Sequence, residues 1–149
     1  MPSGPRRPAQ DHPLHHLHET LRQQLEATSP GDQIARLAEF GFYDWEIGQV
    51  LHRELSVVDR ARTSHELDPR ATDDLTTFLA TCEAIAALSN VPSVVAWFRT
   101  PLVPAYRYTP LDLADKGEGI ELDYAARFCT ATQALAWLET WWRKMTGFA

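Results

Sequence analysis

The sequence is poor in cysteine, with only Cys82 and Cys129, which are far apart and form no CxxC spacing. Two isolated cysteines do not make a disulfide framework. We expect both to be buried thiols of a cytosolic protein and not partners in a disulfide.

Long apolar runs are also missing. No stretch approaches the roughly 18 apolar residues that a membrane-spanning helix needs. The first 13 residues carry charge without a following apolar stretch, which is not the pattern of a secretory signal. We therefore expect a cytoplasmic protein that does not span a membrane.

The common catalytic motifs are absent. There is no GxSxG, P-loop, GxGxxG or HExxH sequence, and no nucleophile, base and orienting group are brought together by their spacing. We therefore expect a protein that is not an enzyme and holds no cofactor. The histidines near the N-terminus include an adjacent pair and have no cysteine beside them, so we expect solvated side chains and no metal site: His12, His15, His16 and His18.

Net positive charge is lacking as well. The formal net charge is −6, which argues against a protein that coats nucleic acid through phosphate attraction. A local basic face remains compatible with this charge. An acidic chain is equally suited to a basic partner.

What the sequence has is helical periodicity and enough apolar residues for a core, in one compact domain or two very small ones. Residues 1–13 hold four prolines and are predicted to be a disordered arm. From Leu14 onward leucines recur at helical spacing, up to a predicted loop at 28–31. Asp32 is expected to cap the next helix, which ends at Gly41.

Further helices are predicted over 42–51, 55–62 and 72–88, with a polar linker at 63–69. Ser93 is expected to cap a short helix. Thr109, Pro110 and Asp112 have the pattern of a helix start, and Lys116-Gly117 that of its end. Two more helices are predicted over 119–128 and from Thr130. No segment reads as a strand, so the predicted fold class is all-α.

The two helices around 43–62 have features of a helix-turn-helix. Gly48 is the small residue expected where the helices cross, and Ile47, Leu51, Val58 and Ala61 supply apolar contacts. His52 and Arg53 depart from the usual turn, which takes a glycine and then an apolar residue. The predicted DNA-contacting side chains are Arg53, Ser56, Arg60 and Arg62. A plain helical hairpin with solvated arginines is the alternative.

A second pattern begins with Val95-Ala96-Trp97-Phe98-Arg99-Thr100-Pro101. It continues through Tyr106, Tyr108 and Thr109-Pro110-Leu111-Asp112-Leu113 to Gly117. This order resembles the C-terminal toxin-binding domain of Xre/MbcA/ParS-type antitoxins. That domain has a Trp-x-x-x-Pro element, a short loop, a Pro-x-(Asp/Glu)-Leu helix start and a glycine. The resemblance covers roughly residues 32–128.

The resemblance implies a degenerate Xre-like helix-turn-helix packed with a small helical toxin-binding domain. It also implies an antitoxin of a type II pair, whose usual partner is a RES-domain toxin that destroys NAD. The helix-turn-helix in such proteins serves autoregulation on operator DNA or oligomerisation, so a homodimer or hetero-oligomer is expected. The partner-binding residues expected in this segment are Trp97, Arg99, Pro101, Tyr106, Tyr108 and Pro110.

The chain continues beyond the family-like region through residues 129–149, with Trp137, Trp141 and Trp142. Three tryptophans on one predicted helix supply a large apolar area, and tryptophan is enriched where proteins bind one another. They either complete the core or bind a partner, and we place all three among the predicted partner-binding residues.

The sequence thus divides into an arm at 1–13, a helix plus helix-turn-helix-like region at 14–64, a linking helix and toxin-binding-like domain at 65–128, and a terminal helix at 129–149. The expected function is that of an antitoxin-like protein that occludes a toxin. A stand-alone helix-turn-helix transcriptional regulator and a scaffold or immunity protein without DNA binding are the alternatives.

Overall fold

A computed structural model describes residues 13–88, 93–100 and 109–114 of the chain, and within these ranges it is all-helical. The all-α prediction is therefore confirmed. The helices predicted over 119–128 and from Thr130 lie outside the described residues, as do the helix end at Lys116-Gly117 and residues 1–12 of the predicted arm. Pro13, predicted as the last residue of that arm, is instead the first residue of a helix. The described helices are α1 (Pro13–Leu25), α2 (Pro30–Phe40), α3 (Asp44–Leu51), α4 (Leu55–Ser64), α5 (Pro69–Leu88), α6 (Val94–Arg99) and α7 (Pro110–Ala114).

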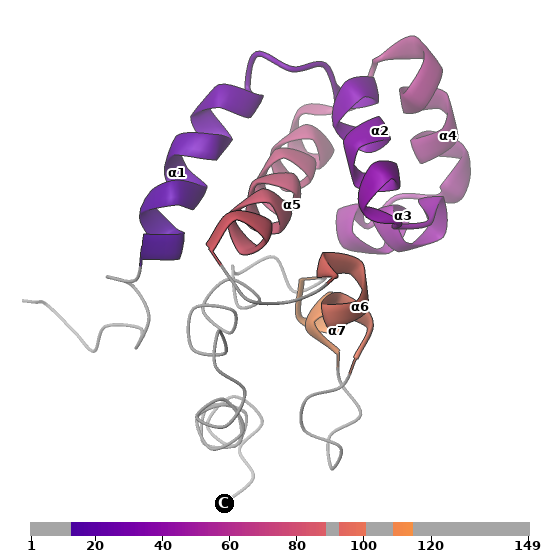
Figure 1. The fold of residues 1–149 in the computed structure, drawn as a ribbon. Helices are drawn as coiled ribbons and strands as arrows, with labels where there is room; N and C mark the ends of the chain where they lie inside the picture. The colour runs from indigo at the N-terminus through magenta and orange to yellow at the C-terminus, as the bar shows by residue number, and fades with distance from the viewer. Residues whose placement is uncertain (1–12, 89–92, 101–108, 115–149) are drawn as a thin grey trace, which may run out of the picture.

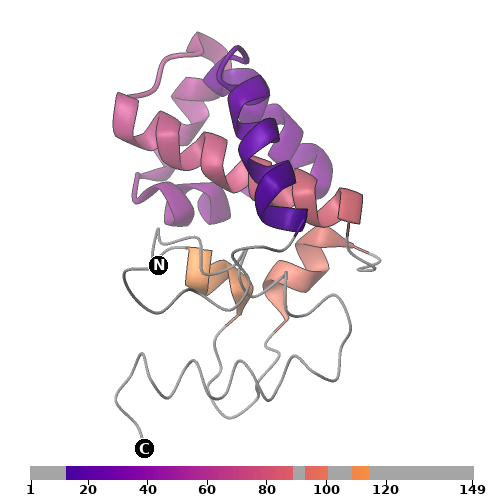
Figure 2. The same ribbon diagram turned by 90° about the vertical axis from the view of Figure 1, so that its left-hand side faces the viewer.

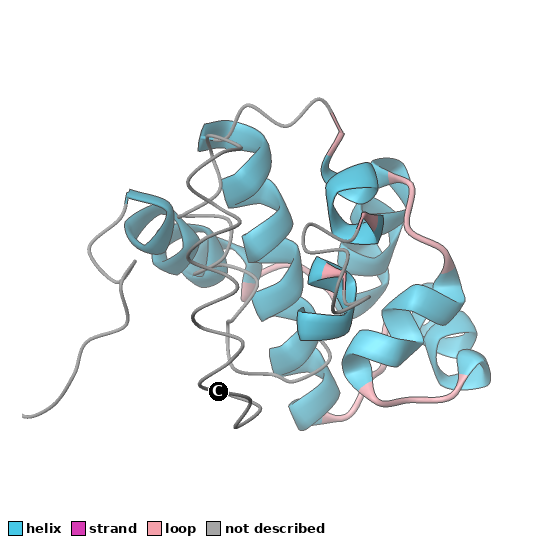
Figure 3. Ribbon diagram, turned by 90° about the horizontal axis from the view of Figure 1, so that it is seen from below, coloured by secondary structure: helices cyan, strands magenta, loops and turns pink. Residues whose placement is uncertain are grey.

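The long helix α5 runs through the middle of the molecule. Helix α1 lies along one side of it, and α2, α3 and α4 gather on the other side (Figure 1). Figure 2, turned by 90°, shows α1 lying across α5. The short helices α6 and α7 lie together beyond one end of this bundle, below it in Figure 1. Figure 3, seen from below, shows the described part of the chain as helices joined by loops, without a strand.

The core follows the apolar face predicted for α5. Leu75, Phe78, Leu79, Cys82 and Ile85 are all buried, whereas Ala86 of the same predicted face is exposed. Edge-to-face contacts join Phe78 to Phe42 before α3 and to Phe98 of α6, at ring distances of 5.3 and 5.2 Å. This aromatic cluster fixes α6 to the main bundle.

The N-terminus of α2 differs from its prediction. Residues 28–31 were expected to form a loop before an Asp32 cap, but the helix already begins at Pro30, and Ser29 accepts a hydrogen bond from the Asp32 N–H at 3.3 Å. Proline is well placed at the first position of a helix, because that residue needs no N–H donor. The signal read as a loop is therefore a helix start, with the cap three residues earlier than predicted.

The linker between α4 and α5 is also shorter than the predicted 63–69. Helix α4 continues to Ser64 and α5 starts at Pro69, not near residue 72. Asp68 caps α5 by accepting a hydrogen bond from the Ala71 N–H at 3.0 Å. Again a capping residue followed by proline marks the true start.

None of the described helices is long and apolar enough to cross a membrane.

Candidate functional site

The first candidate region is the helix pair α3 and α4. Gly48 lies where α3 meets the turn: a Cβ built there would approach the Arg53 carbonyl oxygen to 2.8 Å and Val58 Cγ2 to 3.6 Å. Ile47, Leu51, Val58 and Ala61 are all buried, as predicted. The small residue is therefore required by a close backbone approach.

His52 lies in the turn position that usually takes glycine. It adopts the left-handed conformation, with φ 55° and ψ 44°, and its N–H donates to the Gln49 carbonyl at 3.3 Å. The Arg53 N–H donates to the Gly48 carbonyl at 2.9 Å. The turn thus keeps the glycine-type backbone although it carries a side chain.

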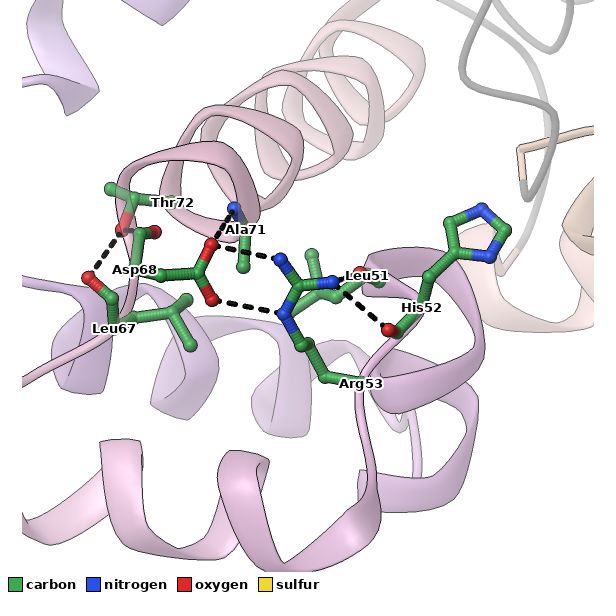
Figure 4. Close-up of polar contacts among 7 residues, drawn as sticks. All are labelled: Leu51, His52, Arg53, Leu67, Asp68, Ala71 and Thr72. Carbon is green, nitrogen blue, oxygen red and sulfur yellow. Dashed lines mark hydrogen bonds and ion pairs between the residues drawn. The ribbon is translucent and has the colours of Figure 1, made fainter.

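Arg53 is partly exposed and reaches the start of α5. Its Nε and Nη2 donate to the two carboxylate oxygens of Asp68 at 2.9 and 2.8 Å, while Nη1 donates to the His52 carbonyl at 3.0 Å (Figure 4). The two bonds from Arg53 to Asp68, followed by that from the Ala71 N–H, hold the pKa of Asp68 well below its usual value. Arg53 therefore joins the α3–α4 turn to the cap of α5.

Arg62 is held in a similar way, because its Nη2 pairs with the carboxylate of Asp44 at the start of α3. Ser56 and Arg60 are exposed on α4. Of the four predicted DNA-contacting residues, two are therefore engaged within the protein and two face solvent. Their role in DNA binding stays a prediction.

The charge of the described helical body is unbalanced. It contains seven arginines and fourteen acidic residues, a formal charge of −7, and no lysine. Five of the arginines are in ion pairs with carboxylates: Arg22, Arg36, Arg53, Arg62 and Arg99. Because most of its cations are neutralised internally, this body presents an acidic surface.

The second candidate region begins at α6, where Ser93 caps the helix as predicted and accepts from the Ala96 N–H at 3.3 Å. Trp97 is buried, with 8% of its surface exposed, and its ring meets that of Phe98 edge-to-face at 5.0 Å. Within the described residues Trp97 therefore lies in the core. Contact between Trp97 and a partner stays a prediction, and it would require α6 to move.

Arg99 connects α6 to α3. Its Nε and Nη2 donate to Glu46 at 2.8 and 2.6 Å, and Nη2 also donates to the Gly41 carbonyl at 2.8 Å. Glu46 is 2% exposed. Burial alone would raise the pKa of Glu46, but the hydrogen bonds from Arg99 and from the Tyr43 N–H lower it overall. A buried carboxylate thus depends on one arginine for its charge balance.

Helix α7 starts as the sequence predicted. The Thr109 N–H donates to Asp112 Oδ2 at 2.9 Å, and the Asp112 N–H donates back to Thr109 Oγ1 at 3.1 Å, which is a reciprocal capping box. Pro110 occupies the first position and is buried. The other predicted partner-binding residues, Pro101, Tyr106, Tyr108, Trp137, Trp141 and Trp142, lie outside the described residues.

Sequence reasoning did not single out an exposed aromatic pair at the start of α3. Tyr43 and Trp45 are each 58% exposed, and their rings stack at 6.4 Å with an interplanar angle of 20°. The guanidinium carbon of Arg99 lies 4.6 Å from the Tyr43 ring centre. The sequence Phe42-Tyr43-Asp44-Trp45 could have indicated this exposed pair. Three aromatic side chains so close together at a helix start do not all fit on the buried face of the helix.

A hollow of about 560 Å³ opens between the end of α1 and the starts of α2 and α5. Several of its polar side chains form hydrogen bonds within the protein. Gln33 donates to the Leu25 and Thr28 carbonyls at 3.1 and 3.0 Å and accepts from Thr76 at 3.0 Å. Ser29 bonds to His65 at 2.8 Å while capping α2. The hollow is therefore the place where three helix ends meet, and these hydrogen bonds hold the ends together.

The side chains described here form no group of three or more metal-ligating residues. His18, predicted to be solvated, is instead half-buried and bonds to the Thr77 carbonyl of α5 at 3.1 Å, because α1 packs against α5.

No protein-family model, no curated protein and no solved structure matches this chain.

Proposed function

We propose that this chain is an antitoxin-like protein that binds a cognate toxin and occludes it. By the resemblance of residues 32–128, the toxin is of the RES type, which destroys NAD. The observation that carries the proposal is the charge distribution of the helical body, in which most arginines are neutralised by carboxylates. Such a surface repels phosphates and attracts a basic protein.

The connection between α6 and α3 adds support. Arg99, in the segment that resembles a toxin-binding domain, forms two hydrogen bonds with buried Glu46 of the helix-turn-helix-like region. The two regions therefore offer one joined surface to a partner. Steric occlusion by a rigid body needs no chemistry from the chain itself.

Co-expression with the product of a neighbouring RES-like gene tests the proposal. Cells that make the toxin alone are expected to lose NAD and stop growing, and cells that also make this chain are expected to keep both. The two proteins should co-purify as a stable complex. Continued NAD loss in the presence of this chain, at equal toxin levels, would contradict the proposal.

The terminal tryptophans allow a sharper version of this experiment. A Trp141→Ala/Trp142→Ala double variant that keeps its melting temperature but no longer protects NAD places these side chains at the interface. A large fall in melting temperature places them in the core instead.

A stand-alone transcriptional regulator is the second candidate, and the geometry of α3 and α4 favours it. Gly48 allows a tight crossing, and Ser56 and Arg60 face solvent on the second helix. A regulator would bind one duplex sequence selectively without any toxin present. A gel shift with fragments of its own upstream region separates the two candidates. An unrelated protein partner without any shift would point to the third class, a scaffold or immunity protein.

A further inference from the structure

Tyr43 and Trp45 form the most unusual surface feature of the helical body, and we name them the aromatic pair. With Leu55, they are the large hydrophobic side chains that the described body leaves exposed, at 58% for each aromatic and 55% for the leucine. Large apolar side chains left in water together mark interaction surfaces more often than isolated ones do. Their rings lie nearly parallel, with centroids 6.4 Å apart.

The aromatic pair is held in place from behind. The Tyr43 N–H donates to Glu46 Oε1 at 2.8 Å, and Glu46 in turn accepts from Arg99. The Arg99 guanidinium also lies over the Tyr43 ring. A surface that is ordered before binding loses little conformational entropy when a partner covers it.

The contacts of the aromatic pair indicate which kind of side chain would bind to it. The Tyr43 ring already accepts one guanidinium from within the chain. Over the Trp45 ring, by contrast, no cation lies among the side chains described here, although tryptophan is the strongest cation–π acceptor among the aromatic residues. A formal charge of −7 on the surrounding body draws cations toward this open ring.

We propose that the aromatic pair is a docking surface for a basic segment of a partner protein, with an arginine or lysine side chain stacked on Trp45. The inference rests on the protein-binding part of the proposed function but not on the identity of the toxin. Nucleic acid bases also stack on aromatic rings, but their phosphates would meet the acidic body. The chemistry therefore favours a cationic protein side chain.

The test is a titration of the full chain with a penta-arginine peptide, followed through the indole N–H resonance of Trp45. That resonance is identified as the one missing from a Trp45→Phe spectrum. Penta-arginine is expected to shift it, and penta-glutamate is not. Trp45→Ala lacks this resonance, so its affinity for penta-arginine is measured by isothermal titration calorimetry beside that of the wild type. It is expected to bind about two- to fivefold more weakly, which is the size of a cation–π contact at an exposed ring.

Leu55→Ala serves as the matched control, because Leu55 has nearly the same exposure but no aromatic face. It should bind the peptide as the wild type does. Unchanged affinity in Trp45→Ala, or an equal loss in Leu55→Ala, overturns the proposal. A stronger shift with an eight-residue thymidine oligonucleotide, or a shift that depends only on protein concentration, overturns it in favour of nucleic acid or of a second copy.

The peptide titration is independent of the co-expression experiment. A Trp45-dependent peptide shift without protection of NAD would support the docking surface and contradict the proposal that the chain occludes a RES-type toxin. Protection of NAD that survives Trp45→Ala, together with a peptide affinity that this variant leaves unchanged, retains the proposed function and rejects the docking surface.

Discussion

At the scale of single residues, a steric contact explains why position 48 is a glycine. Alanine normally stabilises a helix interior by about 1 kcal/mol relative to glycine. Here the added Cβ would lie 2.8 Å from the backbone carbonyl oxygen of Arg53. We expect Gly48→Ala to lower the free energy of unfolding by about 1–2 kcal/mol, since overpacking outweighs the gain in propensity. Urea unfolding measures this, and a stabilised variant would refute the close crossing.

Asp68 both caps α5 and pairs with Arg53, and substitutions can separate these two roles. Asparagine keeps a capping oxygen but loses the charge that pairs with Arg53, whereas alanine loses both. We expect Asp68→Ala to lower the melting temperature more than Asp68→Asn does.

The pH dependence of Asp68 follows from the direction of its pKa shift. Because the pKa of Asp68 is lowered in the folded state, its contribution is present above about pH 4, near the pKa of an unfolded aspartate, and is lost as the pH falls below that. The melting-temperature difference between wild type and Asp68→Asn should therefore shrink below pH 4. A constant difference down to pH 2 would speak against the ion pair.

At the scale of helices, the cap of α2 has a measurable effect. Ser29→Ala removes the side-chain acceptor at the N-terminus of this helix and should cost about 1 kcal/mol in the free energy of unfolding. Ser29→Asn, an equally good cap, should be close to the wild type. Equal losses in both variants would mean that the bond to His65, and not the cap, is what matters.

The joint between α6 and α3 depends on Arg99. In Arg99→Ala the buried Glu46 has no cation, so we expect a loss of about 2–3 kcal/mol at pH 7, below the full cost of a buried pair because Arg99 is 34% exposed. Without Arg99, burial raises the pKa of Glu46, and protonation then relieves the penalty. The loss should therefore become smaller as the pH falls from 7 toward 5, measured by urea unfolding against Arg60→Ala as an exposed control.

These helices also show what the sequence could and could not predict. The cap of α7 was predicted because Thr109, Pro110 and Asp112 are neighbours that act within one turn. The pairing of Arg99 with Glu46 joins residues 53 positions apart, and that of Arg53 with Asp68 joins residues 15 apart. Such pairs depend on how the helices pack, which the local spacing of residues does not determine. The same holds for Trp97, whose burial comes from the aromatic cluster around Phe98.

At the scale of the whole molecule, charge separates the two main candidate functions. An acidic body whose arginines are mostly paired should bind a random 30-base-pair duplex with a dissociation constant weaker than about 10⁻⁴ M at 150 mM salt. Fluorescence anisotropy of a labelled duplex measures this. Tight, sequence-selective binding by the unaccompanied chain would instead make the regulator the better description.

The helical body carries its positive charge on arginine alone, and the two lysines of the sequence, Lys116 and Lys144, both follow α7. The side chains of α1–α7 therefore carry no amine that an acylating reagent could modify. A dye or biotin coupled through lysine would leave Trp45 and the ion pairs of the helices chemically unchanged. Of the two lysines, Lys116 lies within the segment that resembles a toxin-binding domain, and Lys144 lies beyond it.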